Sequence, residues 1–178
     1  MIRLLALAAF LLIASALSPT RLLAQATEQT VAATVTGQSV SMTVSPNSVD
    51  YGTVPFETSR SSLAAPGGAV TFIATNTGNV TEDFYVRGSV ATGSGFSWSL
   101  VTDAITCGSP SNNNKFRHRV TPAVQAALFL SAADDPLATA VAPTDSESFT
   151  SEIYMPCFGS DGAGQQATTN IVVTAVAP

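Results

Sequence analysis

Apolar and polar residues alternate along much of the chain, as they do in strands that bury one face. The strictest alternation covers residues 96–100, where serines separate Phe96, Trp98 and Leu100. Other stretches that favour strands are residues 30–36, 40–44, 49–56, 70–76, 84–88, 115–120, 149–155 and 168–175. Residues 123–132 fit either a strand or a short helix. Clusters of Gly, Pro, Asn and Ser separate these stretches, which indicates turns between them.

The pattern predicts an all-β fold, namely an immunoglobulin-like antiparallel β-sandwich of about seven to nine strands. No stretch of ten or more residues has convincing helical periodicity. We find no linker pattern within residues 27–178, so we expect these residues to form a single domain.

The first 26 residues have the pattern of a secretory signal peptide. Arg3 precedes an apolar run from Leu4 to Leu17, and Ala24–Ala26 supplies an A-x-A cleavage pattern. Ala14–Ala16 is a second candidate, which leaves the cleavage position open. We expect a protein that is secreted to the extracellular space or cell surface, or alternatively the periplasm. After cleavage we expect no membrane span.

Composition narrows the class of protein further. The whole chain is 46% hydrophobic and 11% charged, which excludes global disorder. Without residues 1–26, five basic and twelve acidic residues remain, a net charge of −7. This acidic balance argues against binding to nucleic acid.

The two cysteines, Cys107 and Cys157, are expected to form a disulfide, because an even pair in an oxidising compartment is most simply bridged. The alternatives are two free thiols or an intermolecular bridge. Zinc sites need several His or Cys ligands, which this chain lacks. We expect no metal and no cofactor.

His118 is the only histidine, so a serine–histidine–aspartate enzyme would have to use it. The chain contains no G-x-S-x-G motif, and His118 lies within an expected strand between Arg117 and Arg119. We therefore interpret His118 as a strand residue and expect no catalytic residues and no enzyme activity.

Four residues are candidates for binding. Lys115, Arg117 and Arg119 share one face of an expected strand. They form either a basic stripe for acidic glycans, phosphate or an acidic neighbouring subunit, or a solvated strand face that also protects a sheet edge. Trp98 is either a sugar-stacking platform or a core residue. Asn79 begins an N-glycosylation sequon, whose use the sequence leaves undecided.

Residues 39–90 carry a recognisable set of motifs. Pro46 is followed by the segment Val49–Val54, then by a strand and the turn Asn76–Gly78. This order resembles secreted prokaryotic immunoglobulin-like modules, such as abnormal-spindle/hydin-type domains and camelysin/TasA-type surface proteins. The resemblance implies adhesion, assembly or scaffold roles, and it transfers no catalytic residue.

Our leading hypothesis is a noncatalytic, secreted structural protein of the cell surface or extracellular matrix, such as a fibre or surface-assembly subunit. The alternative is an adhesion module that binds glycans or proteins. Residues 27–45 are either an ordinary first strand or a strand donated to a neighbouring copy, because strand addition uses main-chain hydrogen bonds and alternate side chains.

Overall fold

The computed structural model of the chain describes residues 32–178. The expected signal peptide, residues 1–26, lies outside this range. Residues 37–178 form one unit. The structure is 41% strand and 4% helix, which confirms the all-β class.

The described part contains twelve strands and two short 3₁₀ helices, η1 (Ser62–Ala64) and η2 (Pro110–Asn112). The strands are β1 (Met42–Ser45), β2 (Ser59–Ser61), β3 (Phe72–Asn76), β4 (Glu82–Gly88), β5 (Ala91–Gly93), β6 (Phe96–Leu100), β7 (Lys115–Pro122), β8 (Leu128–Phe129), β9 (Asp135–Val141), β10 (Ser146–Tyr154), β11 (Ala167–Thr168) and β12 (Ile171–Val176).

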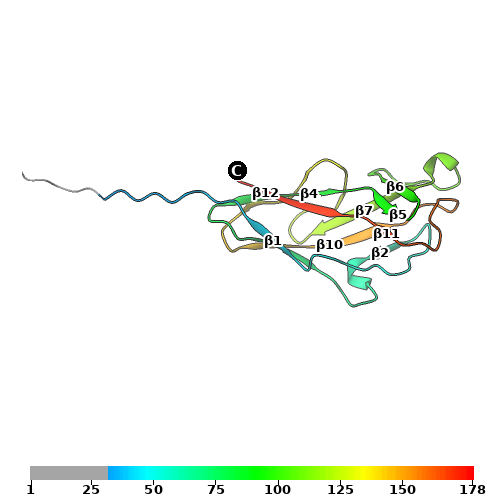
Figure 1. Ribbon diagram of the computed structural model, residues 1–178, viewed down its shortest axis with the longest axis horizontal. Helices are drawn as coiled ribbons and strands as arrows, with labels where there is room; N and C mark the ends of the chain where they lie inside the picture. Colours follow the sequence, from blue (N-terminus) through cyan, green and yellow to red (C-terminus); the bar gives the residue numbers. More distant parts are fainter. Residues whose placement is uncertain (1–31) are drawn as a thin grey trace, which may run out of the picture. The chain divides into compact units, whose positions relative to one another are not determined.

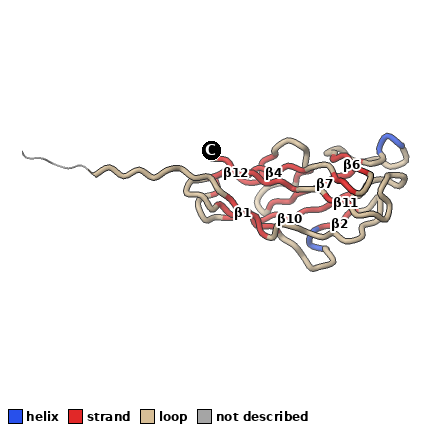
Figure 2. The backbone as a smooth tube through the Cα atoms, viewed as in Figure 1, coloured by secondary structure: helices blue, strands red, loops and turns tan. Residues whose placement is uncertain are grey.

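These strands form two sheets. The larger has the order β1-β3-β10-β7-β6-β5-β11, with β2 also paired to β10 and β8 to β7, and it curls into a half-barrel. The smaller has the order β12-β4-β9. In Figure 1, β4 and β12 lie above β1 and β10. Figure 2 shows that loops, rather than long helices, connect the strands.

The expectation of a wholly antiparallel arrangement is wrong at one pair of strands. β6 and β7 run parallel, with Ser99 opposite Lys115 and Leu100 opposite Phe116. Parallel neighbours need a crossover connection, and residues 101–114 supply it. The other strand pairs in residues 32–178 are antiparallel.

Alternating burial follows the two-residue period of the central strands. In β4, β7 and β10 buried residues alternate with partly exposed ones, so each strand turns one face inward. The main core cluster joins both sheets. Within it the rings of Phe72 and Phe149 stack, with their centroids 5.1 Å apart. A second cluster lies under the curled end of the larger sheet and contains Ala91, Trp98, Phe116 and Ile153.

Two expected strands are absent from the described residues. Residues 32–36 carry no strand. Residues 49–56 form a loop, because the Asp50 carboxylate accepts a hydrogen bond from the Gly52 amide and Gly52 has a φ of 63°. A positive φ is easy for glycine and interrupts a strand. This loop forms one wall of a cleft of about 1020 Å³.

Candidate functional site

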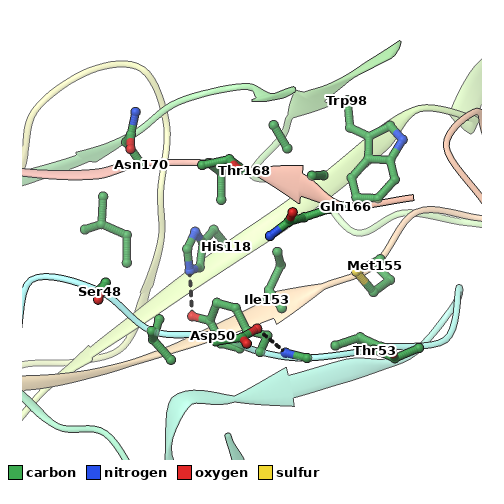
Figure 3. A pocket seen from close by; sticks show the side chains of 18 of the residues that line it. Ser48, Asp50, Thr53, Trp98, His118, Ile153, Met155, Gln166, Thr168 and Asn170 are labelled. Atoms are coloured by element: carbon green, nitrogen blue, oxygen red, sulfur yellow. Dashed lines mark hydrogen bonds between the residues drawn. The ribbon is translucent and has the colours of Figure 1, made fainter. Parts of the chain in front are cut away.

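A cleft separates the loop of residues 46–56 from the segment of residues 162–170 and β12. Its volume is about 1020 Å³, the size of a large ligand pocket. Figure 3 shows His118 between the segment with Asp50 and Thr53 and the segment with Thr168 and Asn170. Apolar side chains from both sheets and the loop line the cleft: Val44, Val49, Phe72, Phe149, Ile153, Ile171 and Val173.

The strand at the side of the cleft, β12, has an unpaired edge. Among residues 32–178 it pairs with β4 alone. Proteins commonly protect such an edge with lysine, proline or a bulge, but the sequence of β12 contains neither charge nor proline. Backbone donors and acceptors along this edge are therefore available to a further strand.

Three polar side chains meet at the wall of the cleft, where Tyr51 and His118 line it. The Tyr51 hydroxyl, from the loop, lies 3.0 Å from His118 Nε2 on β7 and 2.6 Å from Ser151 Oγ on β10. His118 is only 2% exposed, and its Nδ1 atom has no hydrogen-bond partner among the described residues. The alternating strand positions of His118 and Ser151 turn both side chains inward.

Burial determines the charge of this cluster. It lowers the pKa of His118 from 6.5 to about 4, because a buried imidazolium loses its hydration. Burial also raises the pKa of Tyr51 to about 12. Both side chains are therefore neutral at pH 7, and the cluster acts as a set of neutral hydrogen-bonding groups.

This geometry differs from a catalytic triad. Ser151 bonds to Tyr51 rather than to His118, and no carboxylate in the described part of the chain bonds to the imidazole. A triad needs both contacts to activate its serine. The expectation that the protein is not an enzyme stays a prediction.

The three candidate cations share one face of β7, as the alternation predicts, but they do not form a free basic stripe. The Lys115 ammonium donates to Asn112 Oδ1 at 3.1 Å. The Arg119 guanidinium forms an ion pair with Glu152. The Arg117 guanidinium lies over the ring of Phe129. Internal contacts therefore position all three side chains.

Trp98 is a core residue and is 2% exposed. Its indole nitrogen donates a hydrogen bond to the Asp161 carbonyl at 2.9 Å. The indole therefore does not form an open sugar-stacking platform. Phe96 and Phe56 pack against it.

The predicted disulfide between Cys107 and Cys157 is present. It joins the β6–β7 crossover to the segment after β10. Glu57 lies within 4.8 Å of both sulfur atoms, which makes this a geometric candidate for a metal site among the described residues. The sulfurs are bonded to each other and are not thiolates, so they are poor metal ligands.

The turn after β3 holds the start of the folded unit. The Asn79 side chain accepts a hydrogen bond from the Ser39 amide and donates one to the Gly37 carbonyl. The Ser41 amide donates to the buried carboxylate of Glu82. This clamp, formed by Asn79 and Glu82, fixes residues 37–41. It also engages the side-chain nitrogen that N-glycosylation would modify.

Sequence reasoning missed Tyr51, Ser151 and Glu82. The sequence predicts a strand over residues 49–56 that includes Tyr51, and no local signal places this residue beside His118, which is distant in sequence. Ser151 and Glu82 have polar side chains, which sequence reasoning would place on the outward face of a strand. In the structure both side chains are buried. Only the partner that each side chain finds after folding explains its burial.

Comparison with models of protein families, with curated proteins and with solved structures found no match. Within residues 32–178, no helix has the length and apolar character needed to cross a membrane.

Proposed function

We propose that this protein is a noncatalytic, secreted structural subunit of the cell surface or extracellular matrix. In this proposal each subunit assembles by accepting an extended segment of a second copy into its cleft. The segment adds to the free edge of β12, so main-chain hydrogen bonds give affinity and alternate side chains enter the apolar interior.

The observation that carries the proposal is the unpaired edge of β12 beside an apolar cleft. An edge strand without charges or proline is a template for another strand. Ile171 and Val173 face the core cluster, and Val44 and Val49 belong to the same apolar surroundings. An added strand would therefore find both backbone partners and apolar pockets.

The proposed donor is the segment of residues 30–36, where Val31, Ala33 and Val35 alternate with polar or small residues. The segment contains no charge and would span roughly 23 Å as a strand. Val35 is 96% exposed. Because the Asn79 clamp begins at Gly37, the donor segment directly precedes the folded unit.

An immunoglobulin-like β-sandwich architecture is the second part of the proposal. It is supported by two sheets that share one core cluster and by the resemblance of residues 39–90 to secreted surface modules. The adhesion-module alternative is favoured by a separate small pocket lined by Arg117, Tyr154 and Glu57.

Assembly of the chain beginning at Thr27 tests the proposal, with sedimentation velocity and electron microscopy as readouts. We expect oligomers or fibres from the intact chain and monomers from a variant that lacks residues 27–36. A full-length variant with Val31→Asp and Val35→Asp controls for length and should also remain monomeric. Equal assembly of all three chains would refute strand donation.

A further inference from the structure

Arg117 lies outside the cleft, on the outer face of the larger sheet. It precedes His118 on β7, and neighbouring residues of a strand point to opposite faces. Its guanidinium carbon lies 3.4 Å from the centroid of the Phe129 ring and 5.5 Å from that of Tyr154. The two rings pack edge to face at 5.6 Å. The aromatic pair therefore fixes the position of the cation.

The described part of the chain gives Arg117 no polar partner. The other described cations each have one: Arg60 bonds to the Tyr51 carbonyl, Arg87 to Asp134, Lys115 to Asn112 and Arg119 to Glu152. The Arg117 side chain forms no hydrogen bond or ion pair with the described residues, and its Nε atom is buried. A guanidinium has five N–H donors, so this group has unused capacity for an acceptor.

The nearby carboxylate of Glu152 is already engaged. It accepts hydrogen bonds from Arg119, the Tyr154 hydroxyl and the Ser59 hydroxyl. These three donors occupy both of its oxygens. Neither oxygen accepts a hydrogen bond from Arg117, so this guanidinium can receive an acceptor from outside this network.

Arg117 also lines a small pocket of about 260 Å³. This volume is near the lower end of ligand pockets, roughly 300 Å³, and suits one ring-sized group. Tyr154 and Ile105 line it together with Glu57, Thr58 and Ser59. The Thr58 and Ser59 hydroxyls donate to the Pro55 carbonyl and to Glu152, and one Glu57 oxygen accepts from the Phe158 amide, so these groups can still accept further hydrogen bonds. The lining thus combines an aromatic residue, two hydroxyl residues, a carboxylate residue and an arginine whose side chain has no polar partner among the described residues.

We propose that this pocket binds a sugar ring that carries a carboxylate, as in a hexuronate unit of an acidic polysaccharide. The sugar carboxylate pairs with the planar guanidinium of Arg117. The ring packs against Tyr154, and Glu57 accepts hydrogen bonds from sugar hydroxyls. Because Glu57 offsets one positive charge, the pocket favours a single carboxylate with neighbouring hydroxyls over a dianion such as phosphate.

The test uses the chain beginning at Thr27 and measures binding of polygalacturonate by calorimetry. The fully methyl-esterified polymer is the matched ligand, because it keeps the ring but loses the charge. We expect binding of the acid and none of the ester. NMR signals of Thr58, Ser59 and Tyr154 should shift on the unaltered chain, which keeps the test decisive if a variant misfolds.

Two variants, Arg117→Gln and Lys115→Gln, each remove one positive charge from the same face of β7. Arg117→Gln should lower affinity by about tenfold or more, since a charge-assisted hydrogen bond is lost. Lys115→Gln should change it by less than about twofold, because Lys115 does not line the pocket. Equal loss in both variants would indicate diffuse attraction and overturn the proposal, as would equal binding of the ester.

A third comparison distinguishes a carboxylate of a sugar from a carboxylate on an acidic protein surface. If Arg117→Gln weakens self-association while leaving polygalacturonate binding unchanged, the carboxylate comes from a second copy and the proposed sugar site is wrong. If the variant loses polygalacturonate but still assembles, the sugar site is supported independently of strand donation.

Discussion

The inward face of β7 and β10 places polar side chains in an apolar interior, where each must find a partner. The Tyr51 hydroxyl pairs with His118 Nε2 and with Ser151 Oγ, so one loop residue joins two strands. An unpaired buried polar group costs about 1 to 3 kcal/mol. Loss of the Tyr51 hydroxyl would leave two such groups without this partner.

The buried imidazole makes stability depend on pH. Above pH 6.5 both folded and unfolded His118 are neutral, and the full stability is present. As pH falls from 6.5 towards 4, the unfolded chain binds a proton that the folded chain does not. We expect this residue alone to reduce the free energy of unfolding by about 3 kcal/mol across that window.

Urea unfolding at pH 7 and pH 4, with His118→Gln as the control, measures this effect. Glutamine retains an amide that can hydrogen-bond to Tyr51 but cannot titrate, so the variant keeps the contribution of the carboxylates. Its loss of stability between the two pH values should be smaller by about 3 kcal/mol. The same loss in both proteins would show that His118 is not buried in its neutral form.

Strand alternation predicts correctly which residues share a face but not what covers them. It places Lys115, Arg117 and Arg119 together and predicts no individual partner. The ring that covers Arg117 belongs to Phe129, from a segment whose sequence fits either a strand or a helix. The role of each cation therefore depends on a contact that the local pattern does not encode.

Strands with a regular period and several inward apolar residues are predictable from the sequence. β6, β7 and β10 follow this pattern. β2, β5, β8 and β11 contain two or three residues each, too few to show a period. β9 begins at Asp135-Pro136 and its buried positions do not alternate, so no two-residue period predicts it.

The disulfide connects two irregular segments at the curled end of the larger sheet. It encloses 50 residues of sequence separation, including β7, β8, β9 and β10. On the chain-entropy estimate such a cross-link contributes about 4 kcal/mol by restricting the unfolded chain. Neither cysteine lies in a strand, so the disulfide rather than strand pairing joins these two segments.

Replacing both cysteines by serine should lower the free energy of unfolding by about 4 kcal/mol. Guanidinium unfolding of the oxidised protein and the double variant gives this difference. The reduced form of the unaltered chain is the control, because it lacks the disulfide without any substitution at the buried Cys157. It should show a similar loss. A change under about 1 kcal/mol in both would contradict a stabilising role.

At the scale of the whole molecule, the chain combines three features: the unpaired edge of β12, the apolar cleft beside it, and the uncharged segment 30–36, which in sequence directly precedes the residues held by the clamp of Asn79 and Glu82. Taken alone, each of these three features has an ordinary structural explanation. Together they match the requirements of strand addition between copies, in which one chain supplies what the next chain lacks. The cleft formed by two sheets of one chain could not be predicted from alternation, because its walls come from distant segments.

The most direct test is hydrogen–deuterium exchange of β12 in the chain that lacks residues 27–36. A peptide of residues 27–38 is added, and the same peptide with Val31→Ser and Val35→Ser is the control. We predict that the unaltered peptide slows exchange of amides in Ile171–Val176 and that the control peptide does not. Unchanged exchange across β12 at saturating peptide would contradict the account.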